Sequence, residues 1–404
     1  MQISSDKNLL QKVTYLIGSA DTVEKTFCAP AMIPFDGRII DFLNDVSREI
    51  MNDRRSRAYS DVITFAFWIR KGSTVKLKER FEFKDNAFHI GKGVAFHIAP
   101  SNVPVNFAYS LVAGLLNGNA NIVRVPSKDF PQVAILADAF NKALVEHEDM
   151  KPYVICVRYE RDKKINDMFS SVADLRVVWG GDKTIEELRK SPLPPRSGEI
   201  TFADRYSIAV IDSDKYSDIA DKRKVAEDFY NDTFFSDQNA CTSPRIIVWT
   251  GNQTETAKKE FWEEAHKVAE EKYAFQPIQS VNKLTQCFKA STVLEGMKVV
   301  PRKDNLIVRV AVTEITDTVK DFFDNSGYFY EFDCEDISMI KSVCDDKRCQ
   351  TIAYIGGKDT VMPLLRAGVK GVDRVVPIGK TMDFDLIWDG YNLSALMTRT
   401  VVIL

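Results

Sequence analysis

Residues 93–100, GVAFHIAP, form a short apolar run that ends at a turn. An apolar run of this length, bounded by turn residues, is typical of a strand buried in a parallel sheet. A helix of small apolar residues is expected next, over 107–116, and a second strand over 121–125. The run therefore begins a strand–helix–strand series, which predicts an α/β fold with a parallel sheet.

The same alternation continues along the chain. We expect helices at 129–145, 185–189 and 224–235, and strands at 153–157, 175–179, 207–211 and 245–249. Two further strands with exposed edges are expected at 81–84 and 398–404, as candidates for pairing across subunits. Helices between successive parallel strands indicate sheets covered on both faces.

Proline and glycine mark one strong break, PLPPRSG at 192–198. With 404 residues, and roughly 150 residues per domain, two domains are the simplest expectation. We expect one domain over 1–205 and another over 206–390, with a strand pair formed near 80–92 and 391–404.

Composition excludes several classes of protein. The 54 basic and 57 acidic residues give a net charge of -3, without the basic footprint of nucleic-acid or anionic-membrane binding. The first residues lack a signal-peptide pattern, and no apolar run approaches the roughly 20 residues of a membrane span. The seven cysteines are scattered without a CxxC pair, so we expect reduced thiols, a cytoplasmic protein and no metal site.

Three candidate binding segments each follow a predicted strand. Asn102 lies between two prolines, Ser127 and Lys128 precede a helix, and Trp179 precedes the pair Gly180 and Gly181. At such strand ends an amide, a cation and a glycine turn can contact a bound nucleotide. The ordinary alternatives are a plain turn, a helix N-cap at Ser127 and a plain glycine turn, and GxGxxG is absent.

Cys241 stands in a different setting, within FFSDQNACTSPR at 234–245. Structural cysteines normally lie in apolar runs, as Cys156 does. A thiol in a polar turn between a helix and a strand is accessible and can be activated by backbone N–H groups. The alternative is an ordinary surface thiol.

Taken in order, these segments resemble the aldehyde dehydrogenase superfamily, in particular its LuxC-type fatty acyl-CoA reductase branch, which makes long-chain aldehyde in bacterial bioluminescence. The most specific match is DQNACTSPR at 237–245, and Asn102 falls where the superfamily keeps its oxyanion-hole asparagine. The resemblance is good from about 90 to 250, faint through 371–376 and 388–390, and loose over 1–80.

The resemblance implies an aldehyde-dehydrogenase-like fold. Residues 1–205 would form a Rossmann-like cofactor domain, 206–390 an α/β catalytic domain carrying Cys241, and the strand pair a small oligomerisation element. Cys241 would attack an acyl thioester, while Asn102 and the Cys241 N–H hold the oxyanion, roughly 3–4 kcal/mol per donor. Hydride from NADPH would then give a thiohemiacetal, which releases an aldehyde.

Two departures from ordinary aldehyde dehydrogenases refine this expectation. Where those enzymes carry Glu-Leu-Gly-Gly with a general base, this chain has EITFADR at 199–205, with Phe202 at the base position. Glu199 could serve after a small shift in alignment, but loss of the base favours reduction over hydrolysis. Lys128 replaces the acidic residue that accepts the ribose hydroxyl of NAD, which favours NADPH. Gly180 and Gly181 match the phosphate turn, and Trp179 would wall the adenine pocket.

Alternative functions remain open. The same fold would serve an NAD(P)-dependent aldehyde or semialdehyde dehydrogenase, or a non-catalytic scaffold that binds a partner. A Ser-His hydrolase is disfavoured because the four histidines lie outside any nucleophile elbow, and His97 fits a core position. The expected substrates are acyl-CoA or acyl-protein thioesters, and the resemblance suggests a homo-oligomer and an acyl-protein synthetase as a partner.

Overall fold

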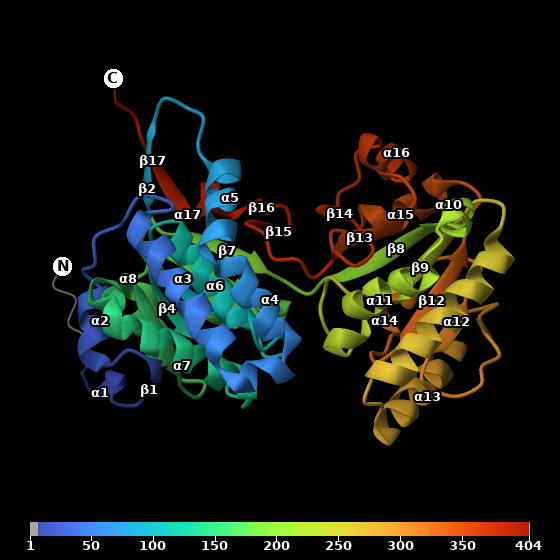
Figure 1. Cartoon of the computed structure of the whole chain (residues 1–404), viewed down its shortest axis with the longest axis horizontal. Helices are drawn as coiled ribbons and strands as arrows, with labels where there is room; N and C mark the ends of the chain where they lie inside the picture. Colours follow the sequence, from blue (N-terminus) through green and yellow to red (C-terminus); the bar gives the residue numbers. More distant parts are fainter. Residues whose placement is uncertain (1–6, 404) are drawn as a thin grey trace. The chain divides into compact units, whose positions relative to one another are not determined.

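The structure is a computed structural model that describes residues 7–403. The chain folds into two compact units (Figure 1). The first comprises the chain up to Ala203 together with the segment from Phe384 onward, and the second comprises Asp204–Asp383. Each unit has its own sheet and its own core.

The first unit is built on a six-stranded sheet in the order β1-β5-β4-β3-β6-β7. Its strands are β1 (Thr14–Ile17), β3 (Val94–Ile98), β4 (Ala120–Arg124), β5 (Val154–Arg158), β6 (Leu175–Trp179) and β7 (Gly198–Phe202). All neighbours are parallel except β1, which pairs antiparallel with β5.

Both faces of this sheet are buried, because alternate residues of a strand point to opposite sides. In β3, Ala95 joins one core cluster, while Val94, Phe96 and Ile98 join another. His97 lies in the same strand and is fully buried, hydrogen-bonded to Ser110 and Asn121. Burial lowers the pKa of His97 to about 4, so the ring is neutral and belongs to the core, as the sequence predicts.

Helices provide the two covering layers of the first unit. They are α1 (Lys7–Leu10), α2 (Ala20–Thr26), α3 (Gly37–Asn52), η1 (Arg54–Ala58), α4 (Ser60–Ile69), α5 (Lys71–Phe81), α6 (Asn106–Leu116), α7 (Pro131–Glu146), η2 (Glu148–Tyr153), α8 (Lys163–Val172), α9 (Asp182–Arg189) and α17 (Leu393–Met397). Ten of the eleven residues of α6 are buried, which only a helix of small and apolar side chains allows in so crowded a position.

The second unit carries a seven-stranded sheet in the order β10-β11-β12-β9-β8-β13-β14. Its strands are β8 (Tyr206–Asp212), β9 (Pro244–Thr250), β10 (Lys298–Val299), β11 (Val308–Ala311), β12 (Tyr328–Asp333), β13 (Cys349–Ile355) and β14 (Arg374–Pro377). Only β10 runs antiparallel to its neighbour. In β8, Ile208 and Val210 face one core cluster and Ala209 and Ile211 the other, so this sheet is also covered on both faces.

The helices of the second unit are α10 (Ser213–Asp218), α11 (Lys222–Asp232), η3 (Phe234–Ser236), α12 (Thr254–Lys272), α13 (Pro277–Ser291), α14 (Asp317–Asp321), η4 (Ile337–Ile340), α15 (Lys341–Asp345), η5 (Lys358–Thr360) and α16 (Met362–Arg366). The helix predicted over 224–235 ends at Asp232, because Thr233 leaves helical geometry before the short turn η3.

One predicted strand is wrong. Residues 81–84 do not form a strand, because α5 continues to Phe81 and buries that side chain against the first core. The strand lies further along, at β2 (Phe88–Gly91), where it pairs antiparallel with β17 (Thr398–Val401). The prediction for 398–404 is therefore right over its first residues, and Leu404 lies outside the described part of the chain. A second small sheet joins β15 (Ile387–Trp388) to β16 (Tyr391–Asn392).

Over residues 7–403, no helix combines the length and the apolar character that crossing a bilayer requires. Across the same described residues, His, Cys, Asp and Glu side chains form no cluster of three that could hold a metal ion.

Candidate active site

The three candidate segments of the first unit lie at one edge of its sheet. Asn102 follows β3, Lys128 follows β4 and Gly180 follows β6, and these strands are neighbours in the order β4-β3-β6. Since the strands are parallel, their carboxyl ends meet at the same edge. Asn102 and Lys128 are exposed there and Gly180 is half-buried, at the edge where open α/β sheets bind ligands.

Ser127 and Lys128 are not part of a helix cap. The helix α7 begins at Pro131, and Phe130 occupies its N-cap position without a side-chain hydrogen bond, so the cap alternative for Ser127 is wrong. The Lys128 Nζ lies 4.7 Å from the centre of the Phe130 ring, and the side chain is exposed. A cation is thus present at the end of β4, on the side of the sheet edge where a nucleotide phosphate would approach.

The pair Gly180 and Gly181 forms the turn from β6 into α9. Gly181 is the N-cap of α9, and the Gly180 N–H donates to the Phe202 carbonyl at 3.1 Å. A Cβ on Gly180 would lie 3.1 Å from Thr184, tighter than ordinary contact. The turn is therefore compact and leaves backbone, not side chain, at the surface.

Trp179 lies inside the core next to this turn. Its ring stacks on Phe202 at a centroid distance of 3.6 Å, and its Nε1 donates to the Ser110 hydroxyl at 3.0 Å. These contacts explain why the side chain is buried. A role for Trp179 as a wall of an adenine pocket stays a prediction.

Glu199, the alternative general base, is held by two cations. It lies on β7 and accepts hydrogen bonds from Arg176 at 2.8 and 2.5 Å and from Arg189 at 2.8 Å. Burial opposes its ionisation, but the hydrogen bonds and charges of Arg189 and Arg176 outweigh burial and lower the pKa of Glu199. A carboxylate stabilised in this way is a weak proton acceptor.

Cys241 belongs to the second unit and lies on a sharp turn between η3 and β9. Two residues of this turn that are not glycine, Asp237 with φ 52° and Gln238 with φ 58°, adopt left-handed backbone geometry. Such geometry costs roughly 1–2 kcal/mol per residue and persists only where the surrounding contacts impose it. Residues 237–243 are therefore held in this turn by their neighbours; we call them the nucleophile turn after the role that the sequence predicts for Cys241.

The position of Cys241 itself is fixed through its backbone and its neighbour. The Ser207 hydroxyl, at the start of β8, donates to the Cys241 carbonyl at 2.7 Å. The Thr242 hydroxyl contacts the Met382 sulfur at 3.2 Å. Cys241 is half-buried, whereas five other cysteines are buried and Cys28 is exposed.

Arg245 is a candidate that the sequence motif contains but that residue reasoning assigned no role. Its guanidinium lies over the Phe323 ring, 3.6 Å from the centroid. Burial lowers the pKa of Arg245 to about 10, and negative charge on Cys241 acts in the opposite direction. A largely buried cation is therefore coupled electrostatically to Cys241.

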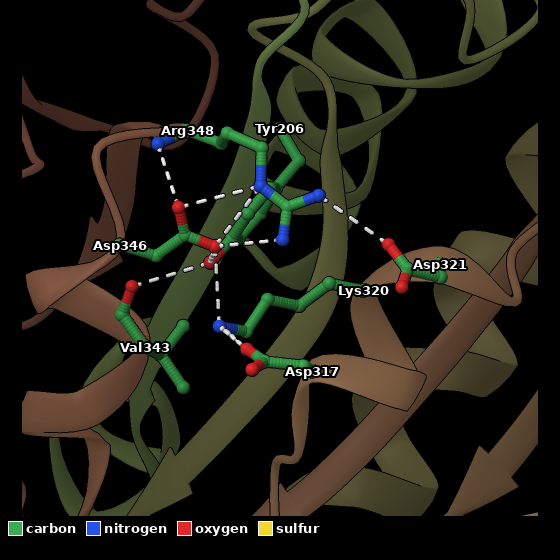
Figure 2. Close-up of polar contacts among 7 residues, drawn as sticks. All are labelled: Tyr206, Asp317, Lys320, Asp321, Val343, Asp346 and Arg348. Carbon is green, nitrogen blue, oxygen red and sulfur yellow. Dashed lines mark hydrogen bonds and ion pairs between the residues drawn. The ribbon is translucent and has the colours of Figure 1, made fainter.

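A polar cluster fixes the amino ends of β8 and β13, at the same edge of the sheet as the nucleophile turn (Figure 2). Asp346 accepts hydrogen bonds from the Arg348 backbone and guanidinium, and from the Lys320 ammonium at 3.1 Å. Burial opposes ionisation of Asp346, but these donors outweigh it and lower its pKa to about 2. The Tyr206 hydroxyl contacts the Val343 carbonyl at 3.2 Å, which anchors the strand just before Ser207.

Comparison with solved structures identifies the fold that this arrangement belongs to. A glyceraldehyde-3-phosphate dehydrogenase from Methanocaldococcus jannaschii, solved with NADP, superposes with a TM-score of 0.66 at 14% identity, covering 100% of this chain and 95% of that one. A benzaldehyde dehydrogenase from Corynebacterium glutamicum gives 0.65 at 14% identity, covering 96% and 94%. The chain therefore has the aldehyde dehydrogenase fold, as the sequence predicts.

The family follows from a match over most of the chain. Residues 74–399 match the acyl-CoA reductase (LuxC) family, and the chain belongs to that family. The long-chain acyl-protein thioester reductase of Vibrio harveyi is 23% identical over 295 residues, 71% of this chain and 59% of that protein. The corresponding protein of Aliivibrio fischeri is 26% identical over 162 residues, 40% of this chain and 33% of that one. The matches thus span between a third and three fifths of these relatives' lengths.

Proposed function

We propose that the protein reduces an acyl thioester to an aldehyde with NADPH, through an acyl group carried on Cys241. Thioester, NADPH and a proton give aldehyde, NADP⁺ and the free thiol of the carrier. The observation that carries the proposal is the nucleophile turn, which holds a half-buried cysteine in a strained, polar setting beside a desolvated arginine. Membership of the acyl-CoA reductase family supports it.

In the proposed reaction, the Cys241 thiolate attacks the thioester carbonyl and the carrier thiol leaves. Arg245 favours the thiolate by its charge. The Asn102 amide and the Cys241 backbone N–H donate to the oxyanion that forms on the carbonyl oxygen, each contributing roughly 3–4 kcal/mol. Asn102 belongs to the first unit and Cys241 to the second.

The residues at the sheet edge of the first unit fit a dinucleotide. Lys128 is exposed where a ribose 2′-phosphate could pair with it, and we propose that the glycine turn of Gly180 and Gly181, at the amino end of α9, lies against the pyrophosphate. Ser127 and Trp179 complete the proposed cofactor site. When bound, the nicotinamide supplies the hydride that reduces the acyl group on Cys241.

Reduction is favoured over hydrolysis by what surrounds the possible base. Glu199 is paired with two arginines, and Phe202, at the base position of the resemblance, stacks on Trp179. Because Glu199 is held in these ion pairs, it is a poor base for activating water, and an acyl-enzyme would survive until hydride arrives. This contrast separates the proposal from its main alternative, an aldehyde or semialdehyde dehydrogenase.

The proposed substrate is a fatty acyl-CoA or an acyl-protein thioester. Relatives of the chain are named long-chain acyl-protein thioester reductases. We also propose that the protein has an acyl-protein synthetase as a partner, that it forms a homo-oligomer and that it is located in the cytoplasm.

The test is NADPH oxidation with acyl-CoAs of graded chain length, with the aldehyde product identified by mass. The native protein should form aldehyde, Cys241→Ala should form none, and the matched variant Cys28→Ser, which removes the exposed cysteine, should behave as the native protein. An acyl adduct trapped on Cys241 without NADPH would identify the nucleophile. If no thioester is reduced but aldehydes are oxidised with NADP, the protein is a dehydrogenase of the same fold and the proposal fails.

A further inference from the structure

The side chain of Gln238 is buried within the nucleophile turn. The Gln238 carboxamide is inaccessible to solvent and makes four hydrogen bonds, all to backbone groups. Its Nε2 donates to the carbonyls of Pro244 at 3.0 Å and Tyr328 at 3.1 Å. Its Oε1 accepts from the N–H groups of Gly327 at 3.0 Å and Tyr328 at 3.2 Å.

These bonds tie the turn to itself and to the neighbouring strand. Gln238 precedes Cys241 by as many residues as Pro244 follows it, so the bond to Pro244 closes the turn around the cysteine. The bonds to Gly327 and Tyr328 attach it to the amino end of β12, which pairs with β9. Every hydrogen-bonding position of the amide is used, and a buried amide in this state has one stable orientation.

The segment that receives these bonds, residues 324–328, is itself held rigidly. The Ser326 N–H donates to the Asp237 carbonyl at 3.0 Å, and the Asn325 side chain donates to Asn239 at 2.6 Å. The buried Lys283 ammonium donates to the Ser326 carbonyl at 2.8 Å and to the Leu306 carbonyl at 3.0 Å. The turn is therefore tied to a segment that is itself hydrogen-bonded to α13 through Lys283.

We propose that Gln238 is a positioning residue for Cys241: its carboxamide holds the left-handed turn so that the cysteine sulfur and its backbone N–H keep one geometry toward the acyl carbonyl. This inference rests on the proposed function of Cys241. The left-handed geometry of Gln238 has no glycine to relieve it, so the four side-chain bonds keep the backbone in place. Loss of these bonds should slow acyl transfer without weakening cofactor binding, because the proposed cofactor residues lie in the other unit.

Gln238→Glu tests the role of the amide donor. The variant keeps the shape but turns a carboxylate toward two carbonyl oxygens, which raises the pKa of the introduced acid. At pH 8 we expect kcat to fall at least tenfold while KM for NADPH changes less than twofold. As the pH is lowered to 6, protonation restores one donor, and kcat relative to the native protein should recover at least threefold. Lys283 and Asp324, whose pKa values are shifted by burial, are present in both proteins, so kcat is compared as a ratio to the native protein at each pH.

The matched control is Gln253→Glu, an exposed glutamine at the N-cap of α12 in the same unit, which should leave kcat and its pH profile unchanged. Should Gln238→Glu fail to fold, Gln238→Gly replaces it, because glycine accepts the left-handed geometry while losing the bonds. It should fold and show the same loss of kcat. Full kcat at pH 8 in the folded variant overturns the inference.

A readout without substrate keeps this inference separate from the proposed function. Amide hydrogen exchange of the peptide spanning 234–245 should be at least tenfold faster in the Gln238 variants, with exchange around β3 unchanged. If the native protein reduces no thioester, the proposed function fails while this readout still tests the Gln238 bonds. Unchanged exchange in an active protein overturns the inference alone.

Discussion

The proposed preference for NADPH rests on the charge of one exposed side chain, Lys128. NADP differs from NAD by a 2′-phosphate, which a cation attracts and a carboxylate repels. The side chain lies at the end of β4, where the resemblance places an acidic residue in proteins that prefer NAD.

We therefore expect Lys128→Glu to raise KM for NADPH at least tenfold and to lower that for NADH, a change of about 1.4 kcal/mol or more in binding. Initial rates with both nucleotides measure the effect. Lys164→Glu, which reverses the charge of an exposed lysine on α8, serves as the control. If the ratio of the KM values for NADPH and NADH did not change, Lys128 would not contact the 2′-phosphate and the prediction would be wrong.

Position 327 requires glycine because the surrounding atoms leave no room for a Cβ. Its φ is 92°, and a Cβ would lie 2.6 Å from the Leu306 carbonyl oxygen and 2.7 Å from the Phe234 ring. Gly327→Ala should destabilise the second unit by about 2–4 kcal/mol, since strain and overpacking add. Denaturant unfolding followed by tryptophan fluorescence would measure this loss.

Gly72 offers the opposite case. It lies in α5, and a Cβ added there would meet no atom within 4 Å, so Gly72→Ala should stabilise the first unit by up to about 1 kcal/mol. If Gly327→Ala and Gly72→Ala changed the unfolding free energy equally, crowding around Gly327 would not explain the need for glycine there.

At the scale of elements, α13 is attached to the support of the nucleophile turn through Lys283. Its ammonium donates to the Leu306 carbonyl just before β11 and to the Ser326 carbonyl just before β12, and lies 4.6 Å from the Phe275 ring centre. Burial lowers the pKa of Lys283 to about 7, although the charges of Asp324 and Asp304 act against this. The helix therefore carries a group whose charge in the folded protein changes near neutral pH.

Proton linkage gives the sign of the effect that the lowered pKa of Lys283 has on stability. Between a folded pKa near 7 and an ordinary value of 10.5, the unfolded chain binds a proton that the folded chain has released. Stability from this group therefore rises as the pH increases from 7. From pH 7 to pH 9, we expect the unfolding free energy of the native protein to rise by about 2 kcal/mol relative to that of Lys283→Met. Urea titrations at each pH measure it, and a difference independent of pH would mean that Lys283 keeps its charge.

At the scale of the whole molecule, the two-stranded sheet of β2 and β17 and the residues just after β17 present apolar side chains to solvent. Phe88, Val402 and Ile403 are exposed, the last two at 69% and 72%. Each strand also has one edge that pairs with no other strand within residues 7–403. Unpaired edges with apolar side chains favour pairing with a second chain.

We expect the native protein to form an oligomer and the double variant Val402→Asp, Ile403→Asp to run at the chain mass of 45.8 kDa. Light scattering after size exclusion measures both. The control pair is Val281→Asp with Phe288→Asp on α13, another exposed apolar surface. If only the control pair dissociated the oligomer, the interface would lie on α13. A monomeric native protein would contradict the expectation.

Over about residues 93–250, the sequence by itself determined the alternation of strands and helices, and it determined the identity of the chemical groups. Buried parallel strands such as 94–98 and 175–179 are mostly apolar, each with one polar residue, and local composition is enough to find them. The Cys241 segment stood out because a thiol among polar residues departs from the normal setting of structural cysteines. The error at 81–84 has a local cause too, since an aromatic alternation fits both the end of a helix and an edge strand.

Only the tertiary structure decided what holds these groups. The four partners of Gln238 come from the backbone of residues 244, 327 and 328, and the two arginines at Glu199 lie on β6 and α9. Trp179, expected to wall a nucleotide pocket, is buried against Phe202. The physical reason is that hydrogen bonds, burial and pKa depend on atoms brought together across long sequence separations, which local patterns do not encode.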